Sequence, residues 1–140
     1  MGCPVGSLLL GSNDLIEKAR RFRKVMGGGW RQAGYLAAAG IYALDNNIQR
    51  IKEDHKRAKI IGEILSRKNY VKEIFPIETN IVIFELPENI LAKDYVSKMA
   101  EHNLLSIAFD KHAVRFVTHL DITDKHIEQF EKIINSVTIF

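Results

Sequence analysis

The order of apolar and polar positions predicts helices in the first half of the chain and a mixture of helices and strands in the second. Residues 7–11, with the sequence SLLLG, are predicted to form a short buried strand. Ser12 or Asn13 then supplies a capping oxygen for a helix that is predicted to run to about Met26.

Three consecutive glycines at 27–29 end this helix, and a second helix is predicted from Trp30 to about Leu44. The second helix is apolar on nearly every face, which is typical of a buried helix. Gly34 and Gly40 each lower its propensity by about 1 kcal/mol relative to alanine, so their presence predicts close packing against another element.

A long amphipathic helix is predicted over residues 46–67. Charged residues cover most of its surface, and its apolar side chains share one stripe, made of Ile48, Ile51, Ala58, Ile61 and Leu65.

The rest of the chain alternates between strands and helices. Strands are predicted at 79–87, 104–110 and 113–120, and helices at 92–103 and at 122–137, the last one capped by Thr123. This order predicts an α/β (α+β) fold, in which helices are followed by a small, mainly antiparallel sheet with helices packed on one face.

Composition narrows the class of protein. The 140 residues are 46% hydrophobic and 26% charged, as in ordinary globular proteins. The net charge is +3, and acids and bases are interspersed, which argues against nucleic acid as a partner. No apolar run approaches the roughly 20 residues that span a bilayer, and the first residues lack a signal-peptide pattern. We therefore expect a cytoplasmic protein with no membrane partner.

The glycine run has two interpretations. Glycines at the start of a helix expose backbone N–H groups to an anion such as phosphate, and Arg31, one residue into the predicted helix, would add a bidentate donor. Alternatively the glycines form a turn between packed helices, because no Walker-type or dinucleotide pattern is present. The nearby bases, Arg20, Arg21, Arg23 and Lys24, are equally compatible with a solvated helix face.

Arg115 lies between apolar neighbours in the predicted strand 113–120. Strand alternation places it on one face with Val117 and His119, and places Val114, Phe116 and Thr118 on the other. A guanidinium in such a position needs an anion, because burying an unpaired charge is costly. The sequence leaves open whether that anion is an internal carboxylate or a ligand.

No other side chain has the spacing of a metal site or a catalytic triad. His119 is either a core or rim histidine or a neighbour of the site around Arg115, and the remaining histidines are predicted to be structural or exposed: His55, His102, His112 and His126. Cys3, the single cysteine, has no basic neighbour that would activate its thiol.

Five segments together resemble the C-terminal half of the low-specificity L-threonine aldolases, which are pyridoxal-phosphate lyases of the aspartate-aminotransferase fold type. They are GCPVGSLLLGS, RFRKVMGGGWRQAGYLAAAGIYAL, EDHKRAK, TNIVIFEL and VRFVTHLDIT. They occur in the order and approximate spacing of the family and span essentially the whole chain. Trp30 stands where the family usually has methionine.

The resemblance implies a division of the chain and a set of site residues. Residues 1–45 would be a remnant of the large cofactor-binding domain, with a strand and interface helices, and 46–140 the small C-terminal domain. Arg115 would bind the α-carboxylate of an amino-acid substrate. Arg31 would reach the phosphate of pyridoxal phosphate, commonly across a subunit interface, and Lys24 would line the same site.

The resemblance also implies that the Schiff-base lysine precedes the PVGS segment, and Met1 stands where a leucine would follow that lysine. We therefore expect no catalytic residue in this chain, and no cofactor bound by this chain alone. The complete enzyme would be a homo-oligomer that cleaves L-threonine or L-allo-threonine to glycine and acetaldehyde. The alternative is a non-catalytic fold or oligomerisation module that needs a separate N-terminal half and pairs through residues 7–10 and 30–44.

Overall fold

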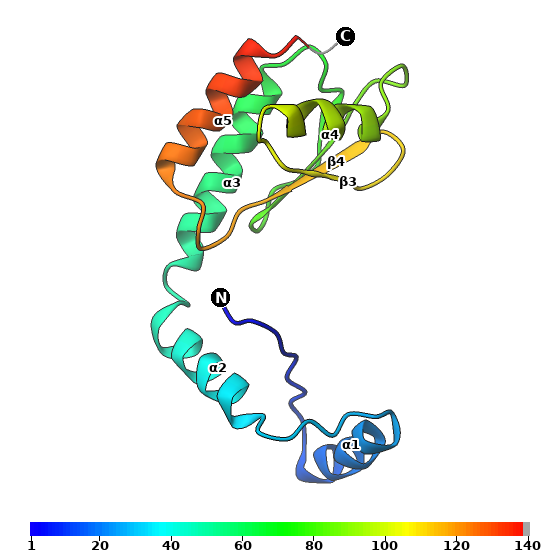
Figure 1. The fold of residues 1–140 in the computed structure, drawn as a ribbon, viewed down its shortest axis with the longest axis vertical. Coiled ribbons are helices and arrows are strands. Elements are labelled where there is room, and N and C mark those ends of the chain that lie inside the picture. Colours follow the sequence, from blue (N-terminus) through cyan, green and yellow to red (C-terminus); the bar gives the residue numbers. More distant parts are fainter. Residues whose placement is uncertain (139–140) are drawn as a thin grey trace. The chain divides into compact units, whose positions relative to one another are not determined.

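A computed structural model describes residues 1–138 of the chain. The chain separates into two compact units, Met1–Ile48 and Gln49–Phe140, whose elements are coloured along the sequence in Figure 1. The predicted division into 1–45 and 46–140, with the first part as a remnant of a larger domain, rests on the resemblance and stays a prediction.

The first unit contains the helices α1 (Asn13–Val25) and α2 (Gly34–Asn46). The Ser12 hydroxyl accepts a hydrogen bond from the N–H of Leu15 at 3.4 Å, which confirms the predicted cap of α1. The helix ends at the glycines: Gly27 has a φ of +87°, and the N–H of Gly28 donates to the carbonyl of Arg23 at 2.7 Å. This pairing is a Schellman-type helix end, which requires the left-handed conformation that glycine adopts without strain.

Two predictions for the first unit are wrong. Residues 7–11 form no strand, and Leu8 and Leu10 are 85% and 87% exposed, because no described strand of this unit pairs with them. The second helix begins at Gly34 instead of Trp30, and Ala43 is its only buried residue.

The predicted close packing at Gly34 and Gly40 is also not observed among residues 1–138. A Cβ added to either glycine would meet no atom within 4 Å. The described part of the first unit therefore provides no surface that packs closely against α2 at these two glycines.

The second unit begins with α3 (Ile51–Ser66), which is shorter at its start than the predicted helix 46–67. The chain turns at 47–50, between the end of α2 and the start of α3, and this turn leaves Ile48 46% exposed and outside the apolar stripe. The remaining helices, α4 (Ala92–Glu101) and α5 (Asp124–Ser136), lie close to their predicted positions. Thr123 caps α5, as predicted, in a reciprocal capping box with His126.

The sheet has four strands in the order β1-β2-β4-β3, and every neighbouring pair is antiparallel. The strands are β1 (Glu73–Ile74), β2 (Ile81–Glu85), β3 (Ile107–Ala108) and β4 (Ala113–Val117). Strand β1 was not predicted, and the other three are shorter than predicted. The predicted α+β class with a small antiparallel sheet is confirmed.

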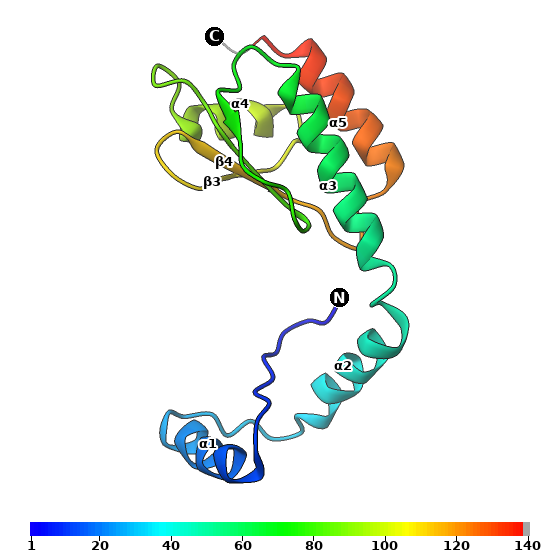
Figure 2. The same ribbon diagram turned by 180° about the vertical axis from the view of Figure 1, so that it is seen from behind.

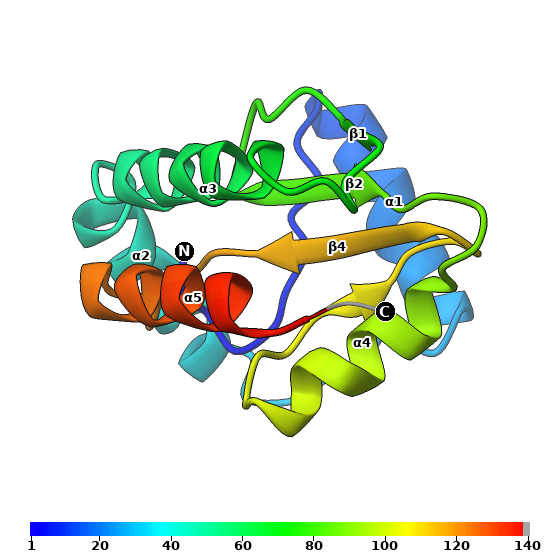
Figure 3. The same cartoon turned by 90° about the horizontal axis from the view of Figure 1, so that it is seen from above.

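Helices cover one face of this sheet. Figure 1 shows α4 in front of the strands, Figure 2 shows the same strands from behind, and Figure 3 shows α3 and α5 side by side. The buried core on this face includes the aromatic rings of Phe84, Phe116 and Phe130. Phe116 stacks on Phe84 at 6.0 Å and meets Phe130 edge-on at 5.3 Å between ring centroids.

Among the described residues, no helix is long and apolar enough to cross a membrane.

Candidate functional site

Arg115 lies on the sheet face opposite the helices, which we call the open face. In β4, Val114 and Phe116 are buried in the core, whereas Arg115 is half-buried and Val117 is 42% exposed. The predicted strand alternation is therefore confirmed. The open face also carries exposed apolar side chains, which strand register places there: Phe75, Ile81, Ile107, Phe109 and Val117. Phe75 is separated from the strand of Arg115 by β2.

No internal acid pairs with Arg115 among residues 1–138. Its Nε atom is buried and has no hydrogen-bond partner. The carboxylate of Glu85, on the same face, instead accepts a hydrogen bond from Lys72 at 2.9 Å, and this bond raises the pKa of the Lys72 ammonium. Of the two alternatives that the sequence left open, the internal ion pair is not present in the described chain.

The aromatic ring of Phe109 contacts the charged group of Arg115. The guanidinium carbon Cζ lies 5.9 Å from the ring centroid, within the range of a cation–π contact. Sequence analysis missed Phe109. Pairing the predicted strands 104–110 and 113–120 as a hairpin would have placed it beside the start of β4, so the signal was present.

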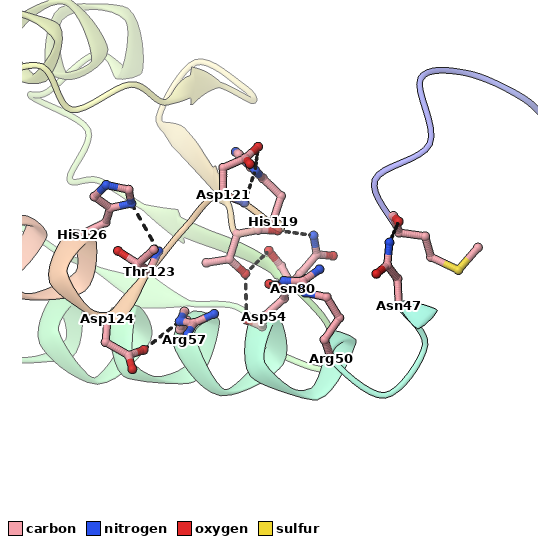
Figure 4. A network of polar contacts seen from close by, with 12 residues as sticks. Asn47, Arg50, Asp54, Arg57, Asn80, His119, Asp121, Thr123, Asp124 and His126 are labelled. Carbon is pink, nitrogen blue, oxygen red and sulfur yellow. Dashed lines mark hydrogen bonds and ion pairs between the residues drawn. The ribbon is translucent and has the colours of Figure 1, made fainter. Parts of the chain in front are cut away.

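Hydrogen bonds at the end of β4 fix the strand that carries Arg115. The backbone N–H of Thr118 donates to the carbonyl of Asn80 at 2.9 Å, and the Asn80 amide donates to the Thr118 carbonyl at 2.6 Å. Close to this pair, Asp54 of α3 is buried and accepts a hydrogen bond from Arg50 (Figure 4). The Thr118 hydroxyl also donates to the main-chain carbonyl of Asp54, so the strand that carries Arg115 is held to the start of β2 and to α3 just beyond the arginine.

The glycine loop of the first unit borders a hollow of about 340 Å³. Its lining includes Lys24, Gly28 and Gly29. A Cβ on Gly29 would lie 2.8 Å from the ammonium nitrogen of Lys24, so a side chain at this position would displace the lysine. Lys24 and the glycine loop are therefore brought together, as an anion site would require.

Arg31 does not line this hollow. It is exposed and lies in the turn at 31–33 before α2, so its predicted position one residue into a helix is wrong. The reason is that the residues before Gly34 form the Schellman-type end of α1 and the turn that follows it, so they are not helical. The roles predicted for Arg31, Lys24 and Arg115 stay predictions.

The histidines have structural contacts. His126 accepts a hydrogen bond from the backbone of Thr123, and a ring nitrogen of His112 lies 2.8 Å from the carbonyl oxygen of Ile90. His119 is exposed, with its Nδ1 3.4 Å from the Asp121 carboxylate. Within residues 1–138 there is no cluster of three side chains that could hold a metal ion.

Comparison with known proteins gives one family match. Residues 1–88 match the family model described as beta-eliminating lyase. The low specificity L-threonine aldolase of Escherichia coli K12 is 41% identical over 131 residues, which are 92% of this chain and 37% of that protein. The probable low-specificity L-threonine aldolase 2 of Arabidopsis thaliana is 36% identical over 143 residues, covering 97% and 40%. The chain thus spans less than half the length of these relatives.

Solved structures share the fold at low identity. The cystine C-S lyase C-DES, in complex with cysteine persulfide, superposes with a TM-score of 0.57 at 17% identity, covering 74% of this chain and 28% of that one. A thermostable omega transaminase mutant from Pseudomonas jessenii gives 0.59 at 14% identity, covering 86% and 31%. These likenesses support the fold alone.

Proposed function

Since the chain belongs to the beta-eliminating lyase family, we propose that it is the C-terminal part of a threonine aldolase that depends on pyridoxal phosphate. The complete enzyme would split L-threonine or L-allo-threonine into glycine and acetaldehyde. Threonine aldolases at 41% and 36% identity support this choice within the family.

The observation that carries the proposal is the unpaired Nε of Arg115. A buried guanidinium N–H without an acceptor is costly, and a bound carboxylate would remove that cost. The planar fork of arginine suits a carboxylate, which it can hold through two parallel hydrogen bonds. We propose that Arg115 binds the α-carboxylate of the substrate and fixes the orientation of its Cα–Cβ bond.

We propose that the hollow beside the glycine loop receives the phosphate of the cofactor. Lys24 supplies positive charge there. Because Gly29 has no side chain, the ammonium group of Lys24 can lie beside it. Arg31 is exposed, and we propose that it reaches the phosphate bound by a neighbouring subunit of a homo-oligomer. When bound, pyridoxal phosphate supplies an electron sink for the bond that breaks.

The lysine that bonds to the cofactor belongs, in this proposal, to the part of the family's length that the chain does not span. The chain itself then contributes binding and orientation: Arg115 holds the substrate carboxylate, and Lys24 and Arg31 hold the phosphate. We propose that the 140 residues alone neither cleave threonine nor bind the cofactor.

A second candidate is a non-catalytic fold or oligomerisation module. The exposed apolar side chains of the first unit favour it, because a surface of this kind is typical of an interaction site. Residues 7–10 and α2 contribute them: Leu8, Leu9, Leu10, Tyr35, Ile41 and Tyr42 are each more than 60% exposed.

A reconstitution experiment separates the two candidates. The chain is mixed with a polypeptide that carries the remaining length of a related threonine aldolase, and acetaldehyde release from threonine is measured. Activity that requires both pieces is expected for the aldolase. A stable complex without activity, formed with cofactor present, would favour the module.

Variants of the reconstituted enzyme then test the assigned roles. Arg115→Ala is expected to raise the KM for threonine on the order of 100-fold while cofactor absorbance is unchanged. Lys24→Ala is expected to weaken cofactor retention. Arg67→Ala, at an arginine whose side chain is 69% exposed, is the matched control and should change neither. Equal losses of substrate and cofactor binding in Arg115→Ala would contradict the carboxylate role.

A further inference from the structure

The contact between Phe109 and Arg115 has a fixed backbone on both sides. The N–H of Phe109 donates to the carbonyl of Ala113 at 2.8 Å, and Arg115 pairs with Ile107 in the ladder of β3 and β4. Both side chains therefore rise from one short hairpin on the same face of the sheet. The ring of Phe109 is 55% exposed, so the pair is accessible to a ligand.

A phenylalanine ring can hold a guanidinium without neutralising it. An acid at this position would pair with Arg115 and compete with any incoming carboxylate, whereas the ring attracts the cation through its face and carries no charge. The acid next to Phe109 is already engaged, because the Asp110 carboxylate accepts a hydrogen bond from the backbone N–H of Lys111 at 2.7 Å. The positive charge of Arg115 stays available for a ligand.

Pre-ordering a long side chain increases its affinity, because less rotamer freedom is lost when the ligand binds. Arginine has many rotamers, and in this chain no described acid restricts those of Arg115. The ring of Phe109 is the neighbour placed to restrict them.

We propose that Phe109 is a positioning residue, which holds the Arg115 guanidinium in place on the open face so that it receives a carboxylate. The proposal rests on the carboxylate-binding role proposed above for Arg115. It adds a residue that acts through the arginine and does not itself touch the reacting atoms.

The test uses the full chain labelled with ¹⁵N-arginine, with acetate as the probe. The side-chain Nε–Hε signal of Arg115 is assigned by its loss in Arg115→Lys. Phe109→Leu is expected to lower the ¹⁵N heteronuclear NOE of this signal and to weaken acetate binding about two- to five-fold. Phe109→Tyr keeps an aromatic face and is expected to restore both. The control Phe75→Leu removes another exposed ring of the open face, and both readouts should stay as in the native chain.

The outcomes distinguish the two proposals. If acetate shifts the Arg115 signal equally in the native chain and in Phe109→Leu, the positioning role is wrong and the carboxylate role stands. If acetate shifts this signal in none of the proteins, the carboxylate role fails, and the positioning role fails with it. Weaker binding in Phe75→Leu as well as in Phe109→Leu would show a general effect of the open face and would also overturn the inference.

Discussion

The hydroxyl of Thr118 donates a hydrogen bond to the main-chain carbonyl oxygen of Asp54 at a distance of 2.7 Å, and Thr118 is 1% exposed. This bond joins the end of β4 to the first turns of α3, between two residues that are 64 positions apart in the sequence. It is a specific long-range contact between the sheet and its covering helix, and it lies three residues beyond Arg115.

Thr118→Val tests this contact, because valine has nearly the same shape as threonine and lacks the hydroxyl. We expect the free energy of unfolding to fall by about 1–2 kcal/mol, since a buried hydrogen bond is lost. Urea unfolding followed by circular dichroism measures the change. The control Thr79→Val, at an exposed threonine, should stay within about 0.5 kcal/mol of the native chain. Equal effects of the two substitutions would contradict the role given to the Thr118 hydroxyl.

Asp54 and Arg50 form an ion pair in which the carboxylate is the more buried partner. Their closest atoms are 2.6 Å apart, and the side chains are 7% and 21% exposed, respectively. Asp54→Ala leaves a half-buried guanidinium without its acid, and we expect a loss of about 2–3 kcal/mol in unfolding free energy.

A double variant distinguishes the effect of the unpaired charge from the effect of lost side-chain packing. Asp54→Leu combined with Arg50→Met removes both charges, so we expect it to recover part of the loss seen in Asp54→Ala. Glu131→Ala breaks the longer, exposed contact of Glu131 with Arg67 at 3.8 Å and should cost less than about 0.5 kcal/mol. Thermal unfolding of the four proteins provides the comparison. A double variant less stable than Asp54→Ala would show that the pair itself stabilises the fold.

The environment of Tyr95 predicts how the free energy of unfolding changes in alkaline solution. Its ring is fully buried, and burial, together with the neighbouring Tyr70 hydroxyl, raises the pKa of the phenol above 10.0. The folded chain keeps this proton while the unfolded chain releases it above pH 10. Stability is therefore fully present below pH 10 and is lost as the pH rises, by up to about 1.4 kcal/mol per pH unit for one tyrosine.

Tyr95→Phe should reduce this alkaline loss. At pH 7 the variant should be within about 1 kcal/mol of the native chain in unfolding free energy, because the buried ring remains and only the hydroxyl is removed. Part of the alkaline loss should persist, since burial also raises the pKa of Tyr70. Unfolding free energies at pH 7 and above pH 10 test both statements, with Tyr42→Phe, 64% exposed, as the control. An alkaline loss as large as in the native chain would contradict the role of Tyr95.

The sequence predicted elements well where one apolar stripe faces one partner. Helices α4 and α5 bury such a stripe, and their positions were close to those predicted. Helix α1 buries no residue, and its bounds were predicted instead from the Ser12 cap and the glycines that follow it. The predictions failed where the described unit covers little of an apolar segment. Residues 7–11 and most of α2 are exposed, and Ala43 is the buried residue of α2. The local sequence shows that a segment is apolar enough to be buried. It does not show which other segment covers it.

The candidate site divides in the same way. Strand alternation correctly placed Arg115 opposite the core, because that depends on local geometry alone. Phe109 could have been found by pairing the two predicted strands as a hairpin. The lack of an internal acid depends on which residues the neighbouring strands place beside Arg115, and the sequence pattern did not specify these. In the first unit, Lys24 lies beside the glycine loop, whereas Arg31 was predicted to lie in a helix that begins only at Gly34; the roles of both stay predictions.

Gly40 provides a test of whether α2 is covered in the assembled protein. A Cβ at Gly40 meets no atom within 4 Å in the described chain, so Gly40→Ala should raise the helical stability of α2 by about 0.5–1 kcal/mol. Far-ultraviolet circular dichroism of the 140-residue chain should show this as increased helicity. Gly28→Ala is the contrasting variant, because its Cβ would lie 2.9 Å from the carbonyl oxygen of Arg23 and should weaken the end of α1.

The reconstituted enzyme then gives the second half of the Gly40 test. If a partner segment packs closely on α2, the added methyl group should oppose that packing, so Gly40→Ala should lower recovered activity even though it stabilises the isolated helix. Opposite effects of one substitution on the chain and on the assembly would identify α2 as a covered surface. Increased helicity with full recovered activity would instead mean that the side of α2 at Gly40 stays in solvent, and the covering partner would have to be sought at the faces of Tyr35 and Tyr42.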